Sequence, residues 1–99
     1  MKKKIAILGS TGSIGITTLN IIKKDKKKFE LILLSTNNNV NKIFKQAKEF
    51  NVKNVIIRNY NQYSKWKSKF VKEKINIYNN YKNFHKIFKN KLDYSINAI

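Results

Sequence analysis

The 99-residue chain contains no cysteine and no proline, only three glycines, one histidine and five carboxylates. Without cysteine it can form neither a disulfide nor a thiolate metal site. A single histidine, His85, and five scattered carboxylates are too few for a self-contained metal centre or a pair of catalytic carboxylates. No apolar run approaches the roughly 18 residues of a membrane span. The basic start of the chain leads into only four apolar residues, Ile5–Leu8, too few for a secretory signal. We therefore expect a cytoplasmic protein, neither secreted nor membrane-bound.

The charge is strongly one-sided, with 22 basic and 5 acidic residues and a formal net charge of +17. Such an excess is typical of nucleic-acid-binding proteins. However, Arg58 is the only arginine, and proteins that read phosphates and bases depend on the arginine fork. We therefore expect the lysines to occupy solvent-facing positions. A nucleic-acid-binding domain that stacks bases on Tyr60, Tyr63 and Trp66 is an alternative.

Short apolar runs alternate with segments of helical spacing along the whole chain. The runs predict five strands, and the segments between them predict helices after each of the first four. The predicted strands are 4–8, 29–34, 54–58, 75–78 and 94–99; the predicted helices are 14–22 with Ser13 as N-cap, 40–50, one opening after Asn61, and one around Phe84, Ile87 and Phe88. This order predicts one α/β domain over residues 1–99, a Rossmann-like doubly wound parallel sheet in three α/β/α layers.

All three glycines fall within one seven-residue segment, Gly9–Gly15, which reads GSTGSIG. It lies between the first predicted strand and the first predicted helix, where a βαβ unit binds a dinucleotide pyrophosphate on backbone N–H groups. Gly9 would permit the tight turn, Gly12 would let the phosphates approach, and Gly15 would let the helix pack against the strand. The hydroxyls of Thr11 and Ser13 add donors. The spacing is G-x-x-G-x-x-G, and no lysine of a Walker loop follows it.

The end of the second predicted strand favours NADPH as the dinucleotide. NAD sites usually carry an acidic residue there, which accepts hydrogen bonds from the ribose hydroxyls. This chain instead has Asn37, Asn38 and Asn39 after Ser35 and Thr36. Since none of these residues is acidic, they would not repel a 2′-phosphate.

The glycine segment Gly9–Gly15, followed by Thr18 and Leu19, resembles the opening of the 1-deoxy-D-xylulose 5-phosphate reductoisomerase family. The similarity continues in further short segments: Phe29 and the strand after it, Asn39–Val40, Gln46–Phe50 and Asn97–Ile99. The resemblance implies the N-terminal NADPH-binding domain of a homodimeric enzyme. That enzyme rearranges and reduces 1-deoxy-D-xylulose 5-phosphate to 2-C-methyl-D-erythritol 4-phosphate with Mg²⁺ or Mn²⁺, in non-mevalonate isoprenoid biosynthesis.

Carried over by position, the resemblance implies that Thr11, Gly12, Ser13 and Ile14 contact NADPH at the pyrophosphate turn. Asn37, Asn38 and Asn39 would surround the adenosine 2′-phosphate. The chain departs from the family in one respect here, because Asn37 and Asn38 stand where a glycine and a basic residue are frequent. The family's metal-binding carboxylates, substrate-phosphate residues and covering loop correspond to positions beyond Ile99. The resemblance therefore implies a fragment without catalytic or metal residues and without turnover of its own.

Another NADP-linked oxidoreductase with the same glycine spacing, of the extended short-chain or semialdehyde dehydrogenase type, is a second alternative. Short-chain dehydrogenases carry a Tyr-x-x-x-Lys pair, and the chain has two, Tyr63 with Lys67 and Tyr78 with Lys82. In so lysine-rich a chain we interpret both pairs as coincidental. We expect Tyr63 to lie on the buried side of a helix.

Overall fold

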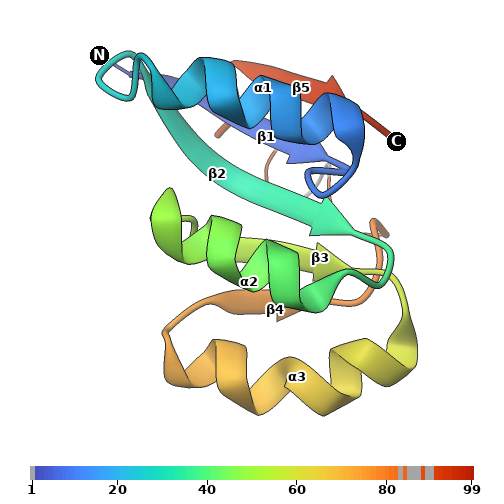
Figure 1. Cartoon of the computed structure of the whole chain (residues 1–99). Helices are drawn as coiled ribbons and strands as arrows, with labels where there is room; N and C mark the ends of the chain where they lie inside the picture. Colours follow the sequence, from blue (N-terminus) through green and yellow to red (C-terminus); the bar gives the residue numbers. More distant parts are fainter. Residues whose placement is uncertain (1, 83, 85–87, 89–90) are drawn as a thin grey trace.

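The computed structural model describes residues 2–82, 84, 88 and 91–99. Strands and helices alternate as predicted (Figure 1). The elements are β1 (Lys3–Leu8), α1 (Ser13–Lys23), β2 (Phe29–Thr36), α2 (Val40–Glu49), β3 (Asn54–Ile57), α3 (Tyr60–Lys72), β4 (Asn76–Tyr78) and β5 (Tyr94–Asn97). The helix predicted around Phe84 and Phe88, like the single histidine His85, lies partly or wholly outside the described residues.

The five strands form one parallel sheet in the order β4-β3-β2-β1-β5. The chain moves outward from β1 to β4 and then returns to pair β5 with the other side of β1. Because crossovers in parallel sheets are right-handed, this reversal places the last connection on the opposite face from α1, α2 and α3. The α/β fold with a Rossmann-like parallel sheet is thus confirmed.

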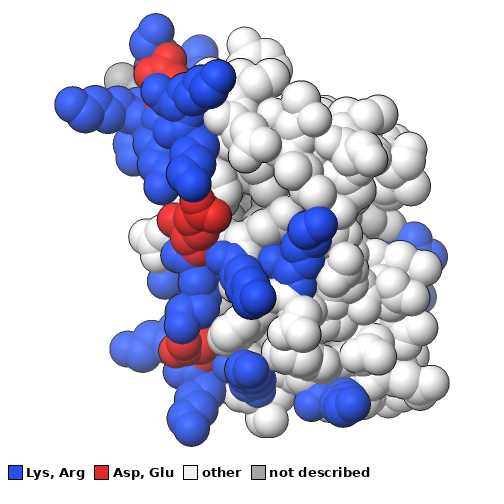
Figure 2. Space-filling model, in the orientation of Figure 1, with Lys and Arg blue, Asp and Glu red and all other residues white. Residues whose placement is uncertain are grey.

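Charged residues gather at the edge of the sheet where the strands begin (Figure 2). The five Asp and Glu side chains all belong to this edge, since each lies at or just after the end of a helix, or at or just before the start of a strand: Asp25, Glu30, Glu49, Glu73 and Asp93. Glu49 pairs with Lys23 at 2.7 Å, and Glu73 pairs with Lys48 at 2.9 Å. Hydrogen bonding and charge from Lys48 hold the pKa of Glu73 below its usual value. The opposite edge, where the strands end, is therefore left without an Asp or Glu side chain.

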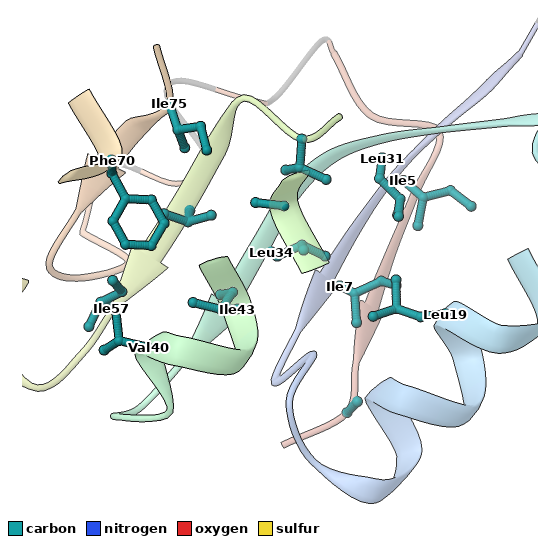
Figure 3. Close-up of a cluster of buried hydrophobic side chains, with 14 of the residues drawn as sticks. Ile5, Ile7, Leu19, Leu31, Leu34, Val40, Ile43, Ile57, Phe70 and Ile75 are labelled. Atoms are coloured by element: carbon teal, nitrogen blue, oxygen red, sulfur yellow. The ribbon is translucent and has the colours of Figure 1, made fainter. Parts of the chain in front are cut away.

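The larger core lies between the sheet and α1, α2 and α3. Strand residues such as Ile7 and Leu34 pack there against Leu19 of α1, Ile43 of α2 and Phe70 of α3 (Figure 3). A smaller cluster on the other face joins Ala6, Leu33 and Ile56 to Phe88, with Tyr81, Phe84 and Leu92 packed around it. Both faces of the sheet are thus covered by apolar side chains. Among the described residues no helix is long and apolar enough to cross a membrane.

Two helix starts differ from the sequence prediction. Gly12, rather than Ser13, is the N-cap of α1, because its backbone is extended (φ −82°, ψ 176°) while Ser13 is already helical. Helix α3 begins at Tyr60, two residues earlier than predicted, because the Asn59 side chain caps it and accepts a hydrogen bond from the Gln62 N–H at 3.1 Å. The strands differ from the prediction only at their ends.

Candidate functional site

A pocket of about 570 Å³ opens at the edge where the parallel strands end. Ligands of open α/β sheets bind at this edge, at the point where the strand order reverses, which here lies between β1 and β5. The lining residues come from the ends of β1, β2, β3 and β5 and from the segment after β4: Gly9, Thr11, Gly12, Ser35, Thr36, Asn37, Asn38, Asn39, Arg58, Tyr81, Ala98 and Ile99.

The glycine turn forms one wall of this pocket, and its three glycines have different surroundings. Gly9 has φ +82°, which favours glycine, and a Cβ there would lie 3.1 Å from the Ile99 nitrogen. A Cβ on Gly15 would lie 2.6 Å from the Ser10 Cα, so α1 packs directly onto the turn. A Cβ on Gly12 would meet only the Gly9 carbonyl oxygen, at 3.7 Å. Gly12 is thus the glycine that leaves open space beside the pocket.

Hydrogen bonds hold the turn against the end of β2 and against α2. The Gly9 N–H donates to both the Ser35 hydroxyl (2.9 Å) and the Ser35 carbonyl (3.1 Å). The Ser10 hydroxyl donates to Gln46 Oε1 at 2.8 Å, and Gln46 Nε2 donates to the Ser10 carbonyl at 3.0 Å. These bonds involve buried side chains of Ser10, Ser35 and Gln46, so water competes little for them and the turn is rigidly placed.

The N-terminus of α1 is open to an anion. The first N–H groups of a helix have no intrahelical acceptor, and the helix dipole makes this end positive. Gly12 has no side chain with which to cap them, and the first turn contains no acidic residue. Ser13 and Ile14 are exposed there and directly follow Gly12, which lines the pocket. The Thr11 hydroxyl bonds to the Thr36 hydroxyl at 2.7 Å, so this side chain joins the turn to β2.

The three asparagines after β2 form a second wall. Asn37, Asn38 and Asn39 are exposed and line the pocket opposite Gly9 and Gly12. The structure therefore brings the predicted site residues to one edge of the sheet. Three of them do not line the pocket: Ser13 and Ile14 are exposed at the start of α1, and Gly15 is buried beneath the turn.

The sequence prediction left Arg58, Tyr81, Ala98 and Ile99 out of the site. Arg58 directly follows β3, which neighbours β2. Because parallel strands end at the same edge of a sheet, its place in the sequence could have predicted that it lies near Asn37. Tyr81 had no such signal. It reaches the pocket through the last connection, where its hydroxyl bonds to the Ser35 hydroxyl at 2.7 Å.

The residues considered for other chemistry lie elsewhere. Tyr63 packs against the larger core, and the Lys67 ammonium lies 5.5 Å from its ring centroid. Neither Tyr63 nor Tyr78 lines the pocket beside the glycine turn. Over the described part of the chain, no three His, Cys, Asp or Glu side chains come together in a way that would hold a metal ion.

Comparison of the sequence with known proteins finds reductoisomerases. The family model described as 1-deoxy-D-xylulose 5-phosphate reductoisomerase matches residues 5–99. The reductoisomerase of Pelagibacter ubique is 50% identical over 99 residues, which cover 98% of this chain and 26% of that protein. The reductoisomerase of Porphyromonas gingivalis is 51% identical over 63 residues, 64% of this chain and 16% of that protein.

Comparison of the fold with solved structures also finds reductoisomerases. The Zymomonas mobilis reductoisomerase in complex with NADPH superimposes with a TM-score of 0.87 at 25% identity, covering 100% of this chain and 26% of that one. A reductoisomerase in complex with NADPH, fosmidomycin and magnesium gives a TM-score of 0.86 at 27% identity, over 98% of this chain and 24% of that one. The chain thus spans about a quarter of the length of the relatives that it matches. It belongs to the 1-deoxy-D-xylulose 5-phosphate reductoisomerase family.

Proposed function

We propose that this chain is the N-terminal NADPH-binding domain of a 1-deoxy-D-xylulose 5-phosphate reductoisomerase. The whole enzyme would convert 1-deoxy-D-xylulose 5-phosphate to 2-C-methyl-D-erythritol 4-phosphate, as a cytoplasmic homodimer that uses Mg²⁺ or Mn²⁺. The observation that carries the proposal is the pocket at the switch point of the sheet, walled by the glycine turn and by three asparagines. Relatives of the same fold are described in complex with NADPH and with magnesium.

The residues present fit a dinucleotide phosphate. Gly12 leaves open space where a Cβ would otherwise project, so the pyrophosphate can approach the backbone there. The N-terminal N–H groups of α1, at Ser13 and Ile14, offer donors at the positive end of the helix dipole. No Asp or Glu side chain lines the pocket, so the phosphates meet no like charge from the side chains that form its walls.

Bound NADPH would supply a hydride, and this domain's contribution is to hold the cofactor in place. The buried bonds from Ser35 and Gln46 fix the glycine turn before the cofactor binds, so little ordering is required on binding. Asn37, Asn38 and Asn39 present amide groups that can donate to the adenosine ribose and its phosphate.

NADPH binding tests the proposal, with Gly12→Val as the decisive variant. A branched side chain at Gly12 projects into the space reserved for the pyrophosphate and meets no core atom, so the fold is kept and binding is lost. We expect NADPH to bind the unsubstituted chain, and the variant's dissociation constant to rise by about a hundredfold or more, as for loss of several charge-assisted bonds. Isothermal titration calorimetry measures both.

The matched control is Ser68→Val, which places the same side chain on the exposed surface of α3, away from the pocket. Its NADPH affinity should equal that of the unsubstituted chain, and circular dichroism should show that both variants are folded. Unchanged affinity in Gly12→Val would refute this placement of the cofactor.

A further inference from the structure

Arg58 is the one charged side chain among the residues that line the pocket, in the part of the chain that the structure describes. None of the described lysines lines the pocket, and the densest group of lysines lies with the carboxylates at the far edge (Figure 2). None of the ion pairs found between described residues includes Arg58. Its guanidinium therefore keeps its charge and its hydrogen-bond donors available for a ligand of this pocket.

The backbone places Arg58 beside the asparagines. Strands β2 and β3 are in parallel register with Thr36 opposite Ile57, so Asn37 and Arg58 leave the sheet next to each other. The Arg58 N–H donates to the Thr36 carbonyl at 3.0 Å, and the Asn59 N–H donates to the Asn37 carbonyl at 2.8 Å. The end of β2 is where dinucleotide-binding sheets read the adenosine ribose. Arg58 thus starts one strand away from the ribose 2′ position.

The side chain of Arg58 has a support within the pocket. Its guanidinium carbon lies 5.0 Å from the centroid of the Tyr81 ring, close enough for a cation–π interaction. The Tyr81 hydroxyl is in turn fixed by the Ser35 hydroxyl at 2.7 Å, beneath the glycine turn. A guanidinium supported on a ring can still direct its planar fork of donors towards phosphate oxygens, which it binds in pairs.

We propose that Arg58 is the residue that recognises the 2′-phosphate and makes this site selective for NADPH over NADH. The inference rests on the proposed function. Asn37 and Asn38 are uncharged, and their amides can hydrogen-bond either a 2′-hydroxyl or a 2′-phosphate, so they discriminate less than a cation does. A single arginine at the end of β3 supplies the positive charge that the 2′-phosphate requires and that a free 2′-hydroxyl does not.

Two probes of the adenosine end alone test this assignment, adenosine 2′,5′-bisphosphate and adenosine 5′-monophosphate. They differ only in the 2′-phosphate and do not depend on how the nicotinamide is held. We expect the unsubstituted chain to bind the bisphosphate at least about tenfold more tightly. In Arg58→Ala the bisphosphate should bind about tenfold to a hundredfold more weakly, as for loss of charge-assisted hydrogen bonds, while monophosphate affinity changes less than about twofold. Isothermal titration calorimetry gives each dissociation constant without an activity assay.

Two further variants serve as controls. Arg58→Lys keeps the charge but loses the fork, so it should restore part of the preference for the bisphosphate. Lys27→Ala removes one exposed positive charge from the turn between α1 and β2, at the opposite edge, and should leave the ratio of the two affinities unchanged. That variant separates recognition by Arg58 from the general attraction of a basic protein for anions.

The outcomes separate this inference from the proposal beneath it. If the unsubstituted chain binds NADPH but Arg58→Ala weakens both probes equally, or neither, the assignment of Arg58 to the 2′-phosphate is wrong and the proposed function stands. If the unsubstituted chain shows no preference for the bisphosphate, the assignment is also wrong. If the chain does not bind NADPH at all, the proposed function fails, and this inference fails with it.

Discussion

The three glycines of the turn illustrate how much one residue type can mean at different positions. All three have the same side-chain hydrogen, yet Gly9 is required by a positive φ, Gly15 by the closeness of Ser10, and Gly12 by neither. The first two therefore serve the fold. The fold does not require glycine at position 12, so a bound ligand is the remaining reason for it, and the binding test therefore substitutes Gly12.

Replacing Gly15 by alanine should destabilise the protein more than the same replacement at Gly12. The new Cβ at Gly15 would lie 2.6 Å from the Ser10 Cα and would force α1 away from the turn, at a cost of about 1–3 kcal/mol. An alanine elsewhere inside a helix would instead gain stability over glycine. Gly12→Ala meets only an ordinary contact at 3.7 Å, and should cost less than about 1 kcal/mol.

Urea denaturation of the two alanine variants compares their free energies of unfolding directly. Intrinsic preference would favour alanine at Gly15, inside the helix, and disfavour it at Gly12, the N-cap, so a greater loss of stability at Gly15 reports the close contact with Ser10. Equal stability of Gly12→Ala and Gly15→Ala would show that α1 does not pack on the turn as described.

Gln46 is another residue whose role the sequence did not reveal. The apolar spacing of residues 40–50 predicts α2 correctly, but it gives no reason for a polar side chain on the buried side. The structure supplies that reason, because Gln46 exchanges two hydrogen bonds with Ser10 of the turn. The residue links the helix that follows β2 to the turn that follows β1.

At the scale of elements, α2 and α3 are each followed by a residue in the left-handed conformation that is not glycine. After α2, Asn51 has φ 56°, and after α3, Lys74 has φ 61°. In α3 the Ile75 N–H donates to the Phe70 carbonyl and the Lys74 N–H to the Val71 carbonyl, at 3.0 and 2.9 Å, which is a Schellman motif. The left-handed residue is usually glycine, and asparagine tolerates the conformation better than lysine does.

Lys74→Gly should therefore stabilise the protein. The left-handed conformation costs a residue with a Cβ about 1–2 kcal/mol, and glycine avoids this cost while making the unfolded chain more flexible. The net gain should be about 0.5–1 kcal/mol, read from the urea midpoint. Asn51→Gly is the matched variant and should change stability little. A loss of stability in Lys74→Gly would mean that the lysine side chain contributes more than its backbone conformation costs.

The elements themselves were largely predictable, and their ends were not. Apolar runs identified the mostly buried strands β2 and β3 and the buried half of β1, shorter apolar patterns identified the more exposed edge strands β4 and β5, and helical spacing identified α1, α2 and α3. The N-cap of α1 was wrongly assigned to Ser13, because serine is the commoner cap and the extended backbone of Gly12 is visible only in the fold.

For the whole molecule, the sheet separates charge from the pocket. Many of the lysines and all five Asp and Glu side chains lie at the edge where strands begin, and the glycine turn lies at the edge where they end (Figures 1 and 2). The high net charge is thus concentrated away from the proposed cofactor. The nucleic-acid alternative would stack bases on Tyr60, Tyr63 and Trp66 of α3, and it gives no account of the glycine turn.

We expect no reductoisomerase turnover from the 99-residue chain supplied with NADPH, manganese and 1-deoxy-D-xylulose 5-phosphate. The proposed reaction needs a divalent ion to hold the substrate oxygens, and the described residues bring together no group of ligands for one. The relatives are about four times as long as the part that this chain matches. Oxidation of NADPH, followed by its absorbance, is the measurement, with the Pelagibacter ubique reductoisomerase as positive control. Clear turnover by the chain alone would contradict the proposal that this domain binds the cofactor but cannot catalyse the reaction by itself.

The sequence by itself determined the alternation of strand and helix, the parallel α/β fold, the position of the glycine turn and the absence of an acid after β2. These are local features, carried by the spacing of apolar residues and by glycine within single segments. The tertiary structure decided which segments meet at the pocket. Arg58 and Tyr81 join Asn37 only because parallel strands end at one edge and the last connection crosses to the other face of the sheet. Such contacts depend on strand order, which local spacing does not encode.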